Sequence, residues 1–240
     1  MNLTIDQGNT AIKIGLFDGD QLVTTLRFTQ LDERQIDQLL ENYPVEAAIL
    51  STVGDTSKLP LDYLQKVCPR FVRFSAQTPV PLVNQYGTPA TLGVDRLASC
   101  VGANYLLPDT NLLVVDMGTC ITLDVVTADG RFLGGNISPG MAMRFKALHQ
   151  YTSALPLVAA EDDVPLIGKN THDAILSGVV QAITYELEGY CKNLSLKYPN
   201  LSLYLTGGDA FFFEKRLKSG IFVNPNLLLV GLNRILQFNA

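Results

Sequence analysis

The beginning of the chain is repeated in outline near its middle, and this internal repeat restricts the fold more than any other feature of the sequence. Residues 3–14 match residues 113–124 when Asp6 is aligned with Asp116. In both copies an apolar segment leads to the aspartate, and a glycine follows after one intervening residue. An Asp-Gly pair, which is a strong hairpin signal, then follows each copy. Each copy therefore predicts a β-hairpin with a tight, glycine-containing bend just past the aspartate.

The two predicted bends have the composition of phosphate-binding loops. Glycine lets the backbone adopt positive φ and approach a ligand closely, and successive N–H groups form a concavity that binds anions. An aspartate beside such a loop can hold the magnesium ion that accompanies a polyphosphate. A single copy would more often be an ordinary strand-to-turn sequence. The duplication, with matching hairpins, favours a clamp that binds a nucleotide from two sides.

The composition supports a globular protein and excludes several classes of function. The chain has 240 residues, of which 47% are hydrophobic, so it can build one large or two small domains without disulfide bonds or structural metal ions. Its formal net charge is −5 and its Lys and Arg residues are scattered, so we expect no nucleic acid among its partners. Since no apolar run approaches the length of a membrane span, we expect no membrane partner either.

The cysteines and the N-terminus indicate in which cellular compartment the protein is expected. The four cysteines lie far apart, with no Cys-x-x-Cys pair, and the chain has two histidines, which excludes the common zinc spacings. We expect the cysteines to be buried thiols of a reducing compartment. Because the first residues lack the pattern of a signal peptide, the expected location is the cytoplasm.

Strand and helix patterns alternate along the rest of the chain. Strands are predicted at residues 21–28, 47–53, 71–74, 201–205 and 220–223, and helices at residues 31–43, 61–67, 141–152, 171–196, 211–219 and 227–238. A further helix is predicted from Asp95 to just before Pro108, and residues 134–140 are predicted to be a loop. Helices that cover mixed sheets define an α/β fold. We therefore expect two like domains, residues 1–108 and 109–240, with a nucleotide in the cleft between them.

Taken together, the motifs resemble those of a known superfamily. The duplicated phosphate loops are similar to those of the actin, hexokinase and heat-shock ATPase superfamily, whose fold is a duplicated ribonuclease-H-like one. Within it, the chain resembles the type III pantothenate kinases. The resemblance rests on motifs that run in family order, at residues 6–13, Tyr86 with 93–96, 116–124, 134–140 with 152–156, 168–171 and 206–209. The one departure is Cys120, where the family usually carries alanine.

The resemblance implies ATP-dependent phosphorylation of the primary hydroxyl of pantothenate to 4'-phosphopantothenate, the first step of coenzyme A biosynthesis. By family position, ATP would be bound by Asp6, Gln7, Gly8, Asn9, Thr10, Ala11, Ile12, Lys13 and Thr119. Asp6 would also lie near magnesium, and Asp116 would bind a monovalent cation, potassium or ammonium. Asp95 would be the general base. Pantothenate would be held by Tyr86, Gly93, Val94, Asp95, Arg96 and Thr171.

The residue types agree in part with this assignment. Pantothenate has a carboxylate, an apolar gem-dimethyl group and an attacking hydroxyl, so it requires a cation, an apolar or aromatic wall and a base. Arg96, Tyr86 and Asp95 supply these three groups within one short segment. Without the family, Asp95 would more simply be an acid that stabilises a helix N-terminus, Arg96 a solvated charge and Tyr86 a packing residue. Thr171 alone would be a helix N-cap.

Further alternatives remain open from the sequence. Residues 206–209 fit the adenosine end of ATP by analogy with the superfamily, or an ordinary strand-to-helix turn. His149 and His172 are expected to be surface or structural residues. A rival function is that of a nucleotide-sensing regulator, which would keep the loops and lose the base, whereas Asp95 is retained. A second rival is a kinase or ATPase with a different acceptor.

A homodimer is expected from the longest helix. Residues 171–196 carry more apolar surface than one outer face requires, and stable interfaces are apolar. The family also places the pantothenate pocket, which includes Thr171, against a partner subunit.

Overall fold

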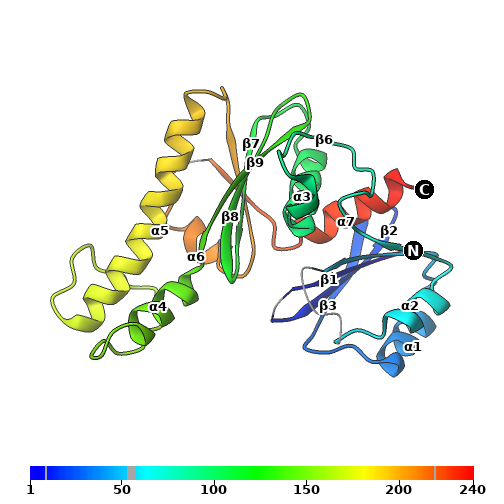
Figure 1. Cartoon of the computed structure of the whole chain (residues 1–240), viewed down its shortest axis with the longest axis horizontal. Helices are drawn as coiled ribbons and strands as arrows, with labels where there is room; N and C mark the ends of the chain where they lie inside the picture. Colours follow the sequence, from blue (N-terminus) through cyan, green and yellow to red (C-terminus); the bar gives the residue numbers. More distant parts are fainter. Residues whose placement is uncertain (9, 53–57, 219) are drawn as a thin grey trace. The chain divides into compact units, whose positions relative to one another are not determined.

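The computed structural model describes residues 1–8, 10–52, 58–218 and 220–240 (Figure 1). By their contacts the residues form two compact units. The first comprises Met1–Asp109, Asp129–Leu133 and Asn226–Ala240, and the second Thr110–Ala128 and Gly134–Pro225. The end of the chain thus groups with the first unit, whereas the division predicted from the repeat assigns it to the second half. The division between residues 108 and 109 stays a prediction about the two halves of the sequence.

The first unit is built on a five-stranded sheet in the order β3-β2-β1-β4-β5. Its strands are β1 (Asn2–Gln7), β2 (Ile12–Asp18), β3 (Gln21–Phe28), β4 (Ala47–Thr52) and β5 (Arg70–Arg73). β1, β2 and β3 form an antiparallel meander, and β4 and β5 run parallel to β1. The first predicted hairpin is therefore confirmed.

The two faces of this sheet carry different helices (Figure 1). Alternate residues of the strands, such as Leu3, Ile5 and Ile14, point into a core shared with α1 (Glu33–Asn42) and α2 (Leu61–Val67). The opposite face is covered by α7 (Leu227–Phe238), which packs on β1, β2 and β4. The side chains of Thr4 and Asp6 belong to that face, because they alternate with Leu3 and Ile5.

A close crossing fixes α3 (Val94–Leu106) against α7. A Cβ atom added at Gly231 would lie 1.8 Å from the carbonyl oxygen of Ala98, and one added at Gly102 would lie 2.4 Å from that of Leu227. Only glycine permits such an approach of two helix backbones. The crossing thereby fixes α3, whose first turn carries Asp95, relative to the sheet.

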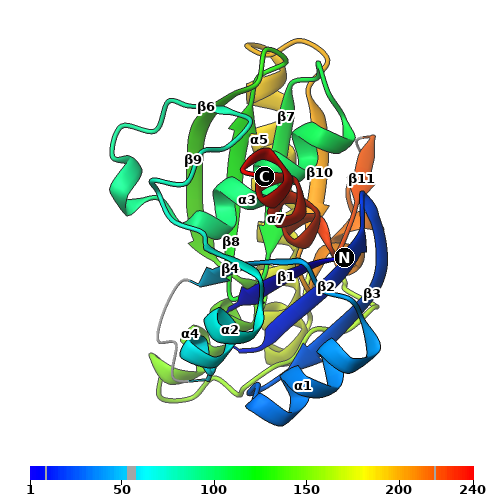
Figure 2. The ribbon, with the colours of Figure 1, turned by 90° about the vertical axis from the view of Figure 1, so that its right-hand side faces the viewer.

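The second unit contains most of a six-stranded sheet in the order β11-β10-β7-β8-β9-β6 (Figure 2). Its strands are β7 (Leu112–Met117), β8 (Cys120–Val126), β9 (Arg131–Pro139), β10 (Ser202–Thr206) and β11 (Ile221–Val223). β7 and β8 form the second predicted hairpin, and β10 runs parallel to β7. β6 (Val83–Asn84) pairs with Arg131 and Phe132, the part of β9 that belongs to the first unit.

The prediction of a loop at residues 134–140 is wrong, because β9 continues through Pro139. The glycines that suggested a loop have another role. A Cβ atom added at Gly135 would lie 1.7 Å from the carbonyl oxygen of Leu123 on the neighbouring strand. The side chain is absent there because two strands approach closely.

The helices of the second unit are α4 (Met141–Gln150), α5 (Thr171–Ser195) and α6 (Ala210–Glu214). Figures 1 and 2 show the long helix α5 along one face of the second sheet, as the apolar pattern predicted. α6 is shorter than predicted and ends at Glu214. Among the residues that the structure describes, no helix has the length and hydropathy needed to cross a membrane.

Candidate active site

The first loop joins β1 and β2 in the first unit. The amide of Gly8 donates to the carbonyl oxygen of Ala11 at 3.1 Å, which closes a tight turn. Thr10 is exposed at this turn. Asn9, which was predicted to bind ATP, lies outside the described residues.

The register of the strands places two charged residues beside this loop. Asp6 of β1 is directly opposite Lys13 of β2, and it pairs with Ser51 of the parallel strand β4. Directly opposite residues share one face of a sheet. The side chains of Gln7 and Ile12 are buried. Of the predicted ATP-binding segment, Asp6 and Lys13 can therefore offer side chains, whereas Gln7 and Ile12 can offer only backbone groups.

The second loop joins β7 and β8 in the second unit. Asp116 is the penultimate residue of β7 and is partly buried, and Gly118 and Thr119 are exposed in the bend. The amide of Gly118 donates to the carbonyl oxygen of Cys120 at 3.0 Å. Both predicted phosphate loops therefore have the same local construction, an aspartate near a strand end followed by a hydrogen-bonded glycine turn.

Two distant glycine segments meet at the second loop. The amide of Gly140 donates to the carbonyl oxygen of Thr119 at 3.1 Å, and a Cβ atom added at Gly140 would lie 2.2 Å from the carbonyl oxygen of Gly118. Gly207 has φ +90°, and a Cβ atom there would lie 2.5 Å from an Asp116 carboxylate oxygen. The motifs at residues 134–140 and 206–209 thus support the same loop.

Asp209, the last residue of the segment that the sequence fitted to the adenosine end of ATP or to an ordinary turn, is a further acidic residue at this strand edge. Its amide donates to the carbonyl oxygen of Met117 at 3.1 Å. Burial raises the pKa of its carboxyl group above the ordinary aspartate value. The sequence singled out the motif Thr206-Gly-Gly-Asp209 but not its place beside Asp116, which follows from β10 running beside β7 and ending where Asp116 lies.

The predicted catalytic aspartate stands at the start of α3 in the first unit. Asp95 is in the first turn, after the N-cap residue Gly93, and its Oδ1 accepts a hydrogen bond from the Arg96 amide at 2.9 Å. A Cβ atom at Gly93 would lie 2.6 Å from that oxygen. Burial raises the pKa of Asp95, although the Arg96 amide and charge act in the opposite direction. A partly buried carboxylate with a raised pKa is a candidate general base.

Arg96 and Tyr86 form a second part of this cluster. Arg96 is only 7% exposed, so its interpretation as a solvated surface charge is wrong. Its guanidinium carbon lies 5.6 Å from the centroid of the Tyr86 ring, within the range of a cation–π contact. The Tyr86 ring lies 6.3 Å from that of Phe132. The structure therefore places Arg96 against Tyr86, with Asp95 bonded to the Arg96 amide, and the roles predicted for the three residues stay predictions.

Thr171 is the first residue of α5 and is exposed. The N-cap is Asn170, whose side chain accepts a hydrogen bond from the Asp173 amide at 2.9 Å. The interpretation of Thr171 as the N-cap is therefore wrong, and its hydroxyl is not used in that way.

Known proteins are similar to this chain over its full length. A family model described as type III pantothenate kinase matches residues 2–193. The chain belongs to this family. Its members include a type III pantothenate kinase of Phocaeicola vulgatus, 45% identical over 239 residues that cover 100% of this chain and 99% of the relative. A type III pantothenate kinase of Cytophaga hutchinsonii is 43% identical over 240 residues and is matched over the full length of both chains.

Solved structures confirm the predicted α/β fold of the actin and hexokinase type. A glucokinase from an Antarctic psychrotroph aligns with a TM-score of 0.56 and 15% identity, over 100% of this chain and 99% of the other. A Campylobacter jejuni protein described as a candidate transcriptional activator of the Baf family aligns with a TM-score of 0.65 and 25% identity, over 99% and 98% of the two chains. The type III pantothenate kinase fold is thus shared with sugar kinases.

Proposed function

We propose that this type III pantothenate kinase transfers the γ-phosphoryl group of ATP to the primary hydroxyl of pantothenate, giving 4'-phosphopantothenate and ADP, the first step of coenzyme A biosynthesis. Identities of 45% and 43% to type III pantothenate kinases, over the full length of this chain, support the reaction. The observation that carries the assignment of residues is the cluster of Asp95, Arg96 and Tyr86, which unites a base, a cation and an aromatic wall. These are the groups that a hydroxy acid with an apolar middle requires.

In the proposed reaction, the Asp95 carboxylate accepts the proton of the pantothenate hydroxyl as the oxygen attacks the γ-phosphorus. The bond between this phosphorus and the β,γ-bridging oxygen breaks, and ADP leaves. A raised carboxyl pKa makes Asp95 a stronger base. The backbone amides of the two glycine loops are proposed to bind the phosphates, with Thr119 adding its hydroxyl. Phosphoryl transfer depends mainly on such positioning and charge stabilisation.

Kinases use ATP together with a divalent cation, which neutralises charge on the β- and γ-phosphates. Asp6 fits such a cation, because it is a partly buried carboxylate beside a turn with glycine, and magnesium prefers oxygen ligands. We assign Asp6 to the magnesium ion that accompanies ATP, and Lys13, opposite Asp6 in the register, to the phosphates.

Pantothenate is assigned to the residues around the start of α3. Arg96 would bind its carboxylate, Tyr86 would cover its apolar part, and the backbone of Gly93 and Val94 would contact its polar groups. Thr171 is proposed to contribute its exposed hydroxyl to the same substrate. An ADP-release assay over a panel of hydroxy acids tests this specificity. Turnover with pantothenate and with no other acid of the panel supports the proposed specificity, and preference for another acid refutes it.

We expect activity to require potassium or ammonium rather than ionic strength alone. Asp116 and nearby backbone carbonyl groups form an oxygen-rich strand end, and potassium binds such oxygens. The measurement compares turnover rates in potassium and sodium buffers at equal ionic strength. We expect the rate to be lower by about tenfold or more in sodium, which corresponds to about 1.4 kcal/mol in activation free energy. Asp116→Asn should remove the difference, whereas the slow variant Asp95→Asn should retain it. Equal wild-type rates in the two buffers would refute the requirement.

We expect a homodimer in solution. The second unit exposes large apolar side chains before, on and just after α5, namely Leu166, Ile167, Tyr185 and Leu196. Such side chains are typical of an interface when they cluster. Light scattering at micromolar concentration should give about twice the chain mass of 26.2 kDa. A monomer with full activity would contradict this proposal.

We also propose that the kinase acts in the cytoplasm. The four cysteines all lie in the described part of the chain and none is in a disulfide, and Cys68, Cys100 and Cys191 are buried. Free buried thiols are usual in a reducing compartment.

A further inference from the structure

Arg144 of α4 connects three segments of the second unit. Its Nε donates to the carbonyl oxygen of Pro139 at 2.8 Å, and its Nη2 donates to the hydroxyl of Ser138 at 3.2 Å. The same nitrogen forms an ion pair with Glu186 of α5. The side chains of Arg144 and Glu186 are 19% and 21% exposed, so water screens this pair less than it would an exposed one. Arg144 therefore holds the end of β9 against α5.

One peptide group links Arg144 to the second phosphate loop. The carbonyl group of Pro139 and the amide of Gly140 belong to the same planar peptide. Its carbonyl accepts from Arg144 Nε, and its N–H donates to the carbonyl oxygen of Thr119 at 3.1 Å. Hydrogen bonds in such a chain polarise one another, so the guanidinium charge strengthens the bond to Thr119.

Gly140 packs so closely against the loop that no side chain would fit there. A Cβ atom at Gly140 would lie 2.2 Å from the Gly118 carbonyl oxygen and 2.5 Å from that of Thr119. A small rotation of the peptide would therefore shift both residues. The peptide between Pro139 and Gly140 therefore supports the loop that carries the exposed residue Thr119.

We propose that Arg144 is a positioning residue for the nucleotide, acting through the peptide between Pro139 and Gly140 on the loop at Gly118 and Thr119. This inference rests on the proposed role of Thr119 in binding phosphate. Arg144 itself touches no substrate in the proposal. Its loss should weaken ATP binding and leave pantothenate binding largely unchanged.

The principal test replaces Arg144 by methionine, which keeps a long apolar stem and removes every donor. We expect Arg144→Met to raise the KM for ATP by about tenfold, because small misplacements of a binding group cost up to about 10²-fold. The KM for pantothenate should change little. Arg144→Lys should recover part of the ATP affinity, since one ammonium can replace the bond to Pro139 or the ion pair to Glu186, but not the fork of donors.

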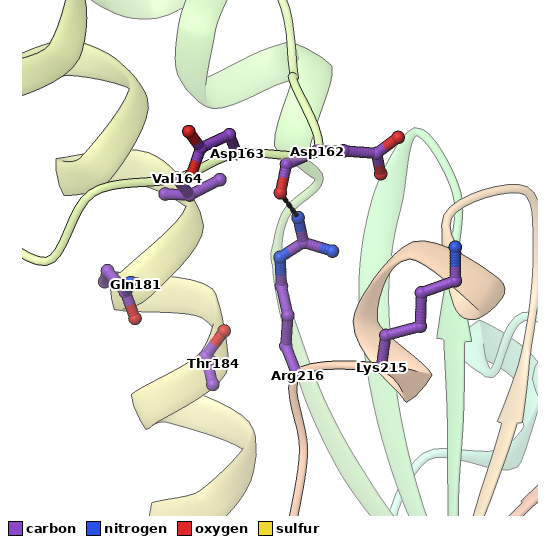
Figure 3. A pocket seen from close by; sticks show the side chains of 7 residues that line it. All are labelled: Asp162, Asp163, Val164, Gln181, Thr184, Lys215 and Arg216. Carbon is purple, nitrogen blue, oxygen red and sulfur yellow. Dashed lines mark hydrogen bonds between the residues drawn. The ribbon is translucent and has the colours of Figure 1, made fainter.

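Arg216 offers a matched control in the same unit. Its guanidinium also donates to backbone carbonyls, those of Phe212 at 2.6 Å and Asp162 at 2.7 Å, and stacks 3.7 Å from the centroid of the Phe212 ring. Arg216 lines a pocket of about 510 Å³, and Figure 3 shows its guanidinium donating to Asp162. Arg216→Met should lower thermal stability, as Arg144→Met should, without raising the KM for ATP. Equal rises in the KM for ATP in both variants would show that Arg144 has only a structural role.

Thr119→Ala separates this inference from the proposed function. If Thr119→Ala leaves the KM for ATP unchanged, the phosphate role of Thr119 is wrong. If it raises the KM for ATP and Arg144→Met does not, the function stands and the inference about Arg144 is overturned. When both single changes raise it, the double variant should be less impaired than the product of the two effects, because they act on one loop. If the double variant raises the KM for ATP by the full product of the two single effects, the inference is also contradicted.

Discussion

Replacing Asp95 by asparagine is expected to lower kcat by about 10²–10⁴-fold, the usual contribution of a general base. Asparagine keeps the shape of the side chain and can still accept the hydrogen bond from the Arg96 amide, but it cannot take the proton of the attacking hydroxyl. The KM for ATP should change little, because the phosphates are assigned to the glycine loops. Steady-state kinetics with pantothenate saturating provide the measurement.

The neighbouring residue gives the contrasting variant. Arg96→Ala removes the proposed carboxylate clamp, so it should raise the KM for pantothenate more than it lowers kcat. If Asp95→Asn retained nearly the wild-type kcat, Asp95 would be only an acid at a helix start. Asp6 would then be the next candidate for the base.

Asp95→Asn is expected to leave the thermal stability of the fold unchanged or to raise it, although it lowers activity. Burial raises the pKa of Asp95, so the folded protein holds this proton more tightly than the unfolded chain does. Stability from this group therefore falls as pH rises from the unfolded pKa through the folded pKa. The asparagine variant does not ionise, so at neutral pH its thermal midpoint should equal or exceed that of the wild type. A lower midpoint would mean that the carboxylate stabilises the fold.

Gly231→Ala is expected to have the largest effect on stability. Its Cβ atom would lie 1.8 Å from the Ala98 carbonyl oxygen, so α3 and α7 would have to separate. Overpacking of this kind costs about 1–3 kcal/mol and occasionally more, and a clash with backbone belongs at the upper end. For a chain of this size, thermal unfolding should shift by about 2–4 °C for each kcal/mol. Activity should also fall, because α3 carries Asp95 and Arg96.

Gly189→Ala in α5 is the matched control for this change. Nothing lies within 4 Å of the added Cβ atom, and alanine is about 1 kcal/mol more favourable than glycine in a helix interior. This variant should be as stable as the wild type or more stable. A Gly231→Ala protein with an unchanged thermal midpoint would show that the two helices can move apart at little cost.

Local patterns predicted many of the elements of this fold. The aspartate, the following glycine and the Asp-Gly pair predicted both hairpins, and the apolar spacing predicted α5 and α7. Residues 134–140 were wrongly predicted as a loop, because a glycine required by close strand approach looks the same in sequence as a glycine in a turn. The grouping of Asn226–Ala240 with the first unit depends on the contacts of α7 with α3, β1, β2 and β4, which lie far from it in the chain, and the apolar pattern of α7 does not identify these partners.

The candidate site was predictable where its residues are adjacent in sequence. Asp95 and Arg96 belong to one motif, and Tyr86 lies shortly before them. The burial of Arg96 was not predictable, since arginine is usually exposed. The support of the second loop by Gly140, Gly207 and Arg144 depends on contacts between residues distant in the chain, which local periodicity does not encode.

The most direct test of the central claim identifies the product made by the purified protein from ATP and pantothenate. Mass spectrometry and phosphorus NMR would establish how many phosphates are added and to which oxygen. We predict one phosphate on the primary hydroxyl of pantothenate, with one ADP formed for each product molecule and this product formed about 10²–10⁴-fold more slowly by Asp95→Asn under the same conditions. ATP consumption that does not depend on pantothenate, or phosphate on any other position, would contradict the account.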